Sequence, residues 1–201
     1  RWRRAAAAAA DLAAGDRALD CCCGTGDLTA ELATRVGPAG EAVGIDFSEQ
    51  MLERAREKAP AGAPMSFRTA DAADLPFADD HFDAATVAFG VRNITDLERA
   101  LAEMTRVVRP DGRIVVLEIT SAGRGRVMGT ALGWFERAVP ALGRLVGRDA
   151  AAYSYLPASA RRFPEPARLA ALMERAGTAS VTWTRFAGGL VCLHHGRVVG
   201  A

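Results

Sequence analysis

Residues 17–27 constrain the fold of this chain more than any other stretch. Residues 18–23 are a short run of small, mostly apolar side chains typical of a buried parallel strand, and Gly-Thr-Gly at 24–26 is a tight turn. Residues 27–36 then carry apolar side chains at helical spacing. Glycine lets the backbone approach a ligand closely, and a helix N-terminus offers unpaired N–H groups with a partial positive charge. Together these segments predict a ligand-binding loop.

Acidic residues after the next two strand-like segments indicate the ligand. A dinucleotide site typically has the pattern Gly-x-Gly-x-x-Gly, but Thr29 occupies the third glycine position here, which disfavours a pyrophosphate. Asp46 ends the second segment, where a carboxylate suits two ribose hydroxyls. Asp71 follows the third segment and could meet an adenine amino group. The pattern favours adenosine without phosphates, as in S-adenosylmethionine, over the plain turn that a single Gly-x-Gly often forms.

Length and charge limit the class of protein. The 201 residues are enough for one domain with a substantial core, and 50% of them are hydrophobic. With 25 basic and 24 acidic side chains the net charge is +1, which gives no electrostatic reason to expect nucleic-acid binding. Because no run of about 18 apolar residues is present, no membrane-spanning helix is predicted.

The rest of the chain alternates between predicted strands and helices. Strands are expected at residues 41–46, 65–70, 82–89 and 114–119, with a helix before each of them except the strand at 82–89, which follows a surface loop at 74–81. This alternation predicts an α/β fold whose parallel sheet is covered by helices on both faces. A helix at 166–176 precedes two further strands, at 181–186 and 190–199, which could pair antiparallel with each other.

Capping signals predict where three helices begin or end. Ser48 is expected to cap the helix that follows it, and Thr95 with Glu98 has the form of a capping box. Gly177 is expected to end the helix at 166–176, and Pro-Asp-Gly at 110–112 is typical of a turn.

The cysteines do not have the spacing of a metal site. Cys21, Cys22 and Cys23 are adjacent, and neighbouring strand residues point to opposite faces, so the three thiols cannot converge on one ion. We interpret them as small strand residues and expect no bound metal. Together with the unpartnered Cys192, they suit a reducing cytosol.

Segments along nearly the whole chain resemble a known enzyme family. The resemblance is carried by residues 19–29, 44–52, 71–77, 82–93, 106–118, 153–156, 163–164 and 193–196. These segments are similar to the class I S-adenosylmethionine methyltransferases, and more closely to the demethylmenaquinone and 2-polyprenyl-6-methoxy-benzoquinol C-methyltransferase family. The Gly-x-Gly turn and Asp46 are common to the superfamily, whereas Phe-Gly-Val-Arg-Asn at 89–93 and Tyr-x-Tyr-Leu at 153–156 are far more specific.

The resemblance implies a Rossmann-like, doubly wound sheet of seven strands, mostly parallel with an antiparallel last strand. We expect a single methyltransferase domain over residues 1–201: a cofactor half at about 1–120, a substrate-lid insertion at about 121–165, and a C-terminal helix and strands at 166–201. Members usually carry a further N-terminal segment that helps cover the cofactor. This sequence lacks it, so we expect a truncated chain.

The resemblance also implies S-adenosylmethionine as cofactor, with S-adenosylhomocysteine as product. Asp20 is expected near the methionine ammonium, and Asp46 at the ribose. Phe47 or Met51 would pack on adenine, although core packing is an equal alternative for Met51. The expected cofactor contacts are Asp20, Gly24, Thr25, Gly26, Asp46, Phe47, Met51, Asp71, Ala72 and Ala88.

Three residues are expected to serve catalysis. Arg92 is cationic at all working pH values, so it would stabilise a developing phenolate or orient a water rather than act as the base. Asn93 would orient the ring oxygen, and Tyr153 would hydrogen-bond a quinol oxygen. The alternatives are a surface arginine, a helix-capping asparagine and a tyrosine that fills the core under the lid.

The expected reaction is C-methylation of a reduced polyprenyl quinone, with demethylmenaquinol converted to menaquinol. The Arg-bearing stretch at 125–147 would form an apolar wall for the prenyl tail and rest transiently on a membrane surface. The expected location is therefore cytoplasmic, peripheral to the inner face of the membrane, and a homodimer is possible. The alternatives are 2-polyprenyl-6-methoxy-benzoquinol or a soluble natural product as acceptor, a non-catalytic cofactor-binding protein, and a nicotinamide dehydrogenase.

Overall fold

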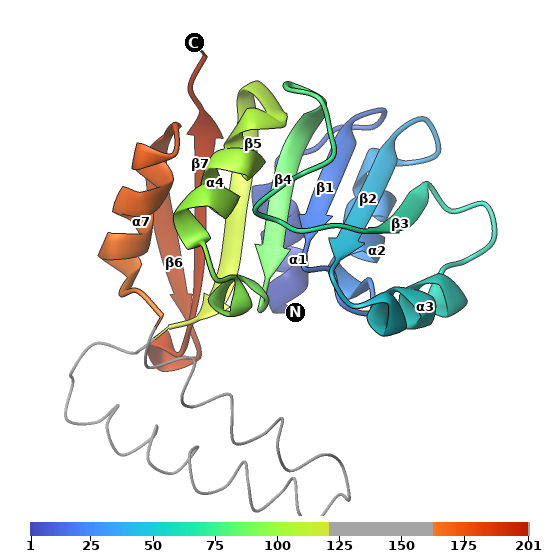
Figure 1. The fold of residues 1–201 in the computed structure, drawn as a ribbon, viewed down its shortest axis with the longest axis horizontal. Helices are drawn as coiled ribbons and strands as arrows, with labels where there is room; N and C mark the ends of the chain where they lie inside the picture. The colour runs from blue at the N-terminus through green and yellow to red at the C-terminus, as the bar shows by residue number, and fades with distance from the viewer. Residues whose placement is uncertain (121–162, 201) are drawn as a thin grey trace, which may run out of the picture.

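The computed structural model describes residues 1–120 and 163–200, and this part of the chain contains one seven-stranded sheet with the order β3-β2-β1-β4-β5-β7-β6 (Figure 1). The strands are β1 Arg17–Cys21, β2 Glu41–Asp46, β3 Met65–Thr69, β4 Phe82–Ala88, β5 Val108–Ile119, β6 Thr178–Phe186 and β7 Val191–Val198. Neighbouring strands from β3 to β5 pair in parallel, while β7 is antiparallel to both β5 and β6. The predicted Rossmann-like sheet with a reversed last strand is confirmed.

The helices lie on both faces of the sheet (Figure 1). They are α1 Trp2–Ala9, α2 Asp27–Val36, α3 Glu49–Lys58, α4 Leu97–Arg106 and α7 Pro166–Arg175, with short 3-10 helices η1 Val91–Asn93 and η2 Ala187–Gly189. Side chains of α1 and α2 form one core cluster against the sheet, and those of α4 and α7 form the other. Successive strand residues alternate between the two clusters: Ala18 packs with α2 and Leu19 with α4.

Strand β5 lies in the interior of the sheet, between β4 and β7. Residues 114–117 are fully buried, as expected for an apolar strand covered on both faces.

Because β1, β2, β3 and β4 run in parallel, their carboxyl ends meet at one edge of the sheet, where ligands bind in such folds.

Local expectations were partly wrong. Helix α4 is capped by Asp96, whose carboxylate accepts the Arg99 N–H at 3.0 Å, and not by the predicted box of Thr95 and Glu98. An aspartate one residue further on forms the same kind of cap, so the helix begins there. Ser48 is the N-cap residue of α3, but its side chain makes no capping hydrogen bond. Gly177 follows α7 with a left-handed φ of 98°, as predicted.

The predicted turn at 110–112 lies instead within β5. Asp111 adopts a left-handed φ of 65°, and the pairing of β5 with β4 shifts register at this point. The turn residues therefore form an irregularity of the strand rather than its boundary. None of the helices in the described ranges is long and apolar enough to span a membrane.

Candidate active site

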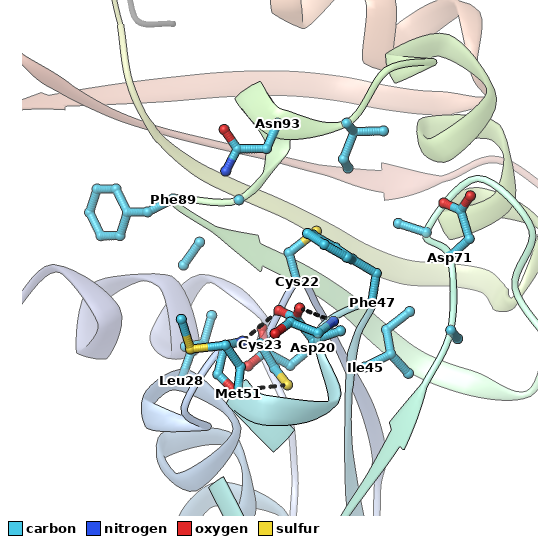
Figure 2. Close-up of a pocket in the computed structure, with 18 of the residues that line it drawn as sticks. Asp20, Cys22, Cys23, Leu28, Ile45, Phe47, Met51, Asp71, Phe89 and Asn93 are labelled. Atoms are coloured by element: carbon cyan, nitrogen blue, oxygen red, sulfur yellow. Dashed lines mark hydrogen bonds between the residues drawn. The ribbon is translucent and has the colours of Figure 1, made fainter. Parts of the chain in front are cut away.

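A cavity of about 780 Å³ lies at the carboxyl edge of the sheet (Figure 2). Its walls come from the segments that follow the first four strands: residues 22–25, 46–48, 70–73 and 88–90. The volume is in the range of cofactor sites in proteins. The adenosine-site prediction rested on these segments, and the structure brings them together around one space.

Two glycines give the loop after β1 its left-handed backbone conformation. Gly24 and Gly26 have left-handed φ values of 55° and 76°, and a Cβ at Gly26 would come within 2.8 Å of the Phe67 ring. The Gly24 N–H donates to the Asp46 carboxylate at 2.9 Å, and the Gly26 N–H donates to the Cys23 carbonyl at 3.0 Å. These two amides are thus used within the protein, and Gly26 lines a smaller adjoining hollow rather than the main cavity.

Asp46 ties two of these loops together. One carboxylate oxygen accepts the Gly24 N–H, and the other accepts the Ser48 N–H at 3.0 Å. A carboxylate has about four acceptor sites, so each oxygen can accept a further hydrogen bond. The side chain lines the cavity at the end of β2, which is the predicted position.

Asp20 is buried beneath the loop. Thr29 Oγ1 donates to one carboxylate oxygen at 2.7 Å, and Thr86 Oγ1 donates to the other at 3.1 Å. Burial raises the pKa of Asp20 from 3.8 to about 7. Sequence reasoning used Thr29 only to exclude a dinucleotide and did not identify Thr86. The Thr at the third glycine position is therefore explained by a hydrogen bond to Asp20.

We predict that Asp20→Asn removes a pH dependence of stability. The folded carboxyl keeps a proton that the unfolded chain releases, so the free energy of unfolding of the wild type should fall between about pH 4 and pH 7. The fall should be on the order of 4 kcal/mol. Urea unfolding across this range should show a much flatter profile for the variant. An equally steep profile in both proteins would contradict the assignment.

Two apolar side chains stand exposed on the wall of the cavity. Phe47 is 78% exposed and Met51 is 37% exposed, and both line the cavity. This exposure argues against core packing as the role of Met51. Asp71 and Ala72 also line the cavity, and the Asp71 carboxylate accepts the Ala73 N–H at 2.9 Å. Figure 2 shows Asp71 on the side of the cavity away from Phe89.

Thr25, Asp27, Ala88 and Phe89 also line the cavity. The Lys58 ammonium donates to the Thr25 hydroxyl and carbonyl at 3.1 Å each, and to the Asp27 carboxylate at 2.5 Å. The predicted residues Thr25 and Ala88 therefore both line the cavity, and the Thr25 hydroxyl accepts a hydrogen bond from Lys58.

Arg92 and Asn93 point in different directions. Asn93 is exposed and lines the cavity (Figure 2). Arg92 is not among the lining residues: its side chain is 9% exposed and lies 2.7 Å from the Glu118 carboxylate. The same guanidinium nitrogen donates to the Phe89 carbonyl at 2.5 Å. Within the described residues, Arg92 thus holds the loop after β4 and does not face the cavity.

Glu118 was missed by sequence reasoning. It is fully buried in β5, accepts the backbone N–H groups of Arg92 and Ile119, and burial raises the pKa of its carboxyl, a shift that Arg92 opposes. The available signal was a single acid in a continuous apolar strand, because such an acid needs a buried partner. Tyr153 and nearly all of the expected lid lie outside the described residues.

Comparison with known proteins identifies the family. The sequence model of the ubiE/COQ5 methyltransferase family matches residues 1–198. A demethylmenaquinone methyltransferase of Thermus thermophilus is 45% identical over 98% of this chain and 89% of its own length. A demethylmenaquinone methyltransferase of Desulfitobacterium hafniense is 41% identical over 98% of this chain and 79% of its own. A ubiquinone/menaquinone biosynthesis C-methyltransferase of Pseudomonas paraeruginosa is 39% identical over 97% and 77%.

Solved structures confirm the fold. A S-adenosylmethionine-dependent methyltransferase from Aquifex aeolicus superposes with a TM-score of 0.68 at 19% identity, covering 94% of this chain and 85% of that one. The [4+2]-cyclase SpnF superposes with a TM-score of 0.71 at 19% identity, covering 100% and 81%. A cyclase and a methyltransferase share this fold, so the sequence match is what identifies the family. The chain belongs to the ubiE/COQ5 methyltransferase family.

Proposed function

We propose that this protein transfers a methyl group from S-adenosylmethionine to a ring carbon of a reduced polyprenyl quinone, with demethylmenaquinol as the acceptor. The observation that carries the proposal is the cavity at the carboxyl edge, in a chain whose relatives are named demethylmenaquinone methyltransferases. S-Adenosylmethionine supplies an activated methyl group, and the protein binds and orients the two reactants.

The residues present fit this cofactor. The Asp46 carboxylate keeps acceptor sites for the two ribose hydroxyls, and Phe47 and Met51 offer apolar surface to a flat ring. Asp71 and Ala72 line the cavity and would read the adenine edge, while the carboxyl groups of Asp20 and Asp27 would favour the positive charges of the methionine end. An acid-rich wall suits a ligand that carries a sulfonium and an ammonium group.

For the acceptor, ionisation of a ring hydroxyl raises the electron density on the carbon that receives the methyl group. The Asn93 amide, on the cavity wall, would orient that ring oxygen. Arg92, which does not line the cavity, would act indirectly, by holding the backbone at Phe89. Tyr153 is proposed to contribute a hydroxyl to the same oxygen.

The polyprenyl tail places the acceptor in a membrane, so we propose a cytoplasmic protein that touches the inner face of the membrane transiently. A homodimer stays a prediction for sedimentation to test. The names of the relatives include ubiquinone biosynthesis, which keeps 2-polyprenyl-6-methoxy-benzoquinol as the second candidate acceptor.

Turnover with a methyl-labelled cofactor tests the proposal. We expect label in menaquinol when demethylmenaquinol is supplied in detergent under reducing conditions, and none with the oxidised quinone, whose ring has no hydroxyl to ionise.

Asn93→Ala should lower kcat roughly 100-fold without unfolding the protein, because Asn93 is exposed. Methylation of a soluble phenol but of neither quinol would favour the natural-product alternative, and cofactor binding without any transfer would favour the non-catalytic one.

A further inference from the structure

Arg3 in α1 lines the cavity, although α1 lies far from the strand-end loops in sequence. Among the described residues that line the cavity it is the single cationic side chain, because the other charged residues there are Asp20, Asp27, Asp46, Asp71 and Asp96. The cavity therefore has an acidic wall with one positive charge at a defined place.

That place is beside Phe89, on the side of the cavity away from Asp71 (Figure 2). The Arg3 guanidinium carbon lies 5.7 Å from the centroid of the Phe89 ring, and its nearest carboxylate is Asp27 at 3.8 Å. Burial raises the pKa of Asp20, and the positive charge of Arg3 opposes part of that increase. Since Phe89 and Asp71 are on opposite sides of the cavity in Figure 2, Arg3 lies beside the end expected for methionine.

The Arg3 guanidinium makes no close polar contact with the described residues. The Asp27 carboxylate is already held by Lys58 at 2.5 Å, and the 3.8 Å contact with Arg3 is too long for a hydrogen bond. Within the described ranges no hydrogen bond of the Arg3 side chain is found, whereas neighbouring Arg4 donates to Glu31 at 3.1 Å. A guanidinium carries five N–H donors in a planar fork that matches a carboxylate.

Helix α1 holds Arg3 in place. Ala6, Ala7 and Ala10 are buried in the core cluster shared with α2. Their small side chains let α1 pack closely on α2, the helix that begins at the Gly-rich loop. The alanine run thus positions the start of α1 at the mouth of the cavity.

The loop after β1 has few free donors to compete for an anion. The N–H groups of Cys23, Gly24 and Gly26 donate to the Ile45 carbonyl, the Asp46 carboxylate and the Cys23 carbonyl. A carboxylate at this end of the ligand therefore has Arg3 as its available cation, while an ammonium group has the aspartates.

We propose that Arg3 binds the α-carboxylate of the methionine moiety of the cofactor, an inference that rests on the proposed function. The contact would fix the amino-acid end of the ligand, while Asp46 would fix the ribose. Because the sulfonium joins these two parts of the cofactor, its position would then be fixed as well. Arg3 is then a binding residue for the cofactor and has no direct part in the chemistry.

A pair of ligands isolates this contact. S-Adenosylhomocysteine carries the carboxylate, and its decarboxylated analogue, S-adenosyl-3-thiopropylamine, keeps the ammonium group but lacks the carboxylate. We expect the wild type to bind the first roughly tenfold to a hundredfold more tightly than the second by calorimetry. Arg3→Met should abolish this preference by weakening only the first ligand, and Arg4→Met, the matched control on the same helix, should keep it.

The outcomes separate the two proposals. If the wild type binds neither ligand, the proposed function fails and this inference fails with it. If the wild type binds S-adenosylhomocysteine but Arg3→Met weakens both ligands equally, Arg3 has only a structural role and the inference alone is overturned. Unchanged affinities in Arg3→Met overturn it as well.

Discussion

Replacing Arg92 with leucine should lower the free energy of unfolding by about 3–5 kcal/mol. The substitution removes the cation that lies 2.7 Å from the fully buried Glu118 carboxylate and leaves that acid in the core without its partner. It also removes the bond from the guanidinium to the Phe89 carbonyl. Chemical denaturation followed by circular dichroism measures the loss.

The double variant Arg92→Leu with Glu118→Leu provides the control. Replacing both charges with apolar groups removes the unpaired acid, so the double variant should be more stable than Arg92→Leu alone. A loss below about 1 kcal/mol for Arg92→Leu would show that the pair does not hold the loop. A reduced turnover of Arg92→Leu should then be compared with its folded fraction before a catalytic role is assigned.

Asp46→Ala should weaken S-adenosylhomocysteine binding by about 100-fold or more, because hydrogen bonds to a charged acceptor are among the strong ones. The variant loses the acceptor for the ribose, and it also frees the Gly24 and Ser48 N–H groups that the carboxylate holds. Calorimetric titration of wild type and variant gives the ratio of Kd values.

The matched control for Asp46 is Asp79→Ala. Asp79 pairs with Arg106 on the surface, its side chain is 73% exposed, and it does not line the cavity. Its removal should leave the Kd within about twofold. An Asp46→Ala variant that binds as tightly as the wild type would show that the end of β2 is not the ribose site.

The sheet and the acids at its carboxyl edge were predictable from sequence because both depend on local pattern. Asp46 is the last residue of β2 and Asp71 follows β3, so both lie at the carboxyl edge of the parallel sheet. The glycines of the first loop follow from the same local geometry.

The direction of a side chain was not predictable where it depends on a distant partner. Arg92 turns away from the cavity because Glu118, on the neighbouring strand β5, is buried beneath it. Asp20 is held by Thr86 of β4 in the same way. The position of Arg3 depends on how an alanine-rich helix packs on α2, a tertiary contact that helix propensity does not encode.

The most direct test of this account is a calorimetric titration of the protein with S-adenosylhomocysteine, with NADH as the control ligand. We predict saturable binding of S-adenosylhomocysteine at a single site and no binding of NADH, because Thr29 replaces the glycine that a dinucleotide loop needs and its hydroxyl is bound to Asp20. Tight binding of NADH, or no binding of S-adenosylhomocysteine, would contradict the assignment of the cavity.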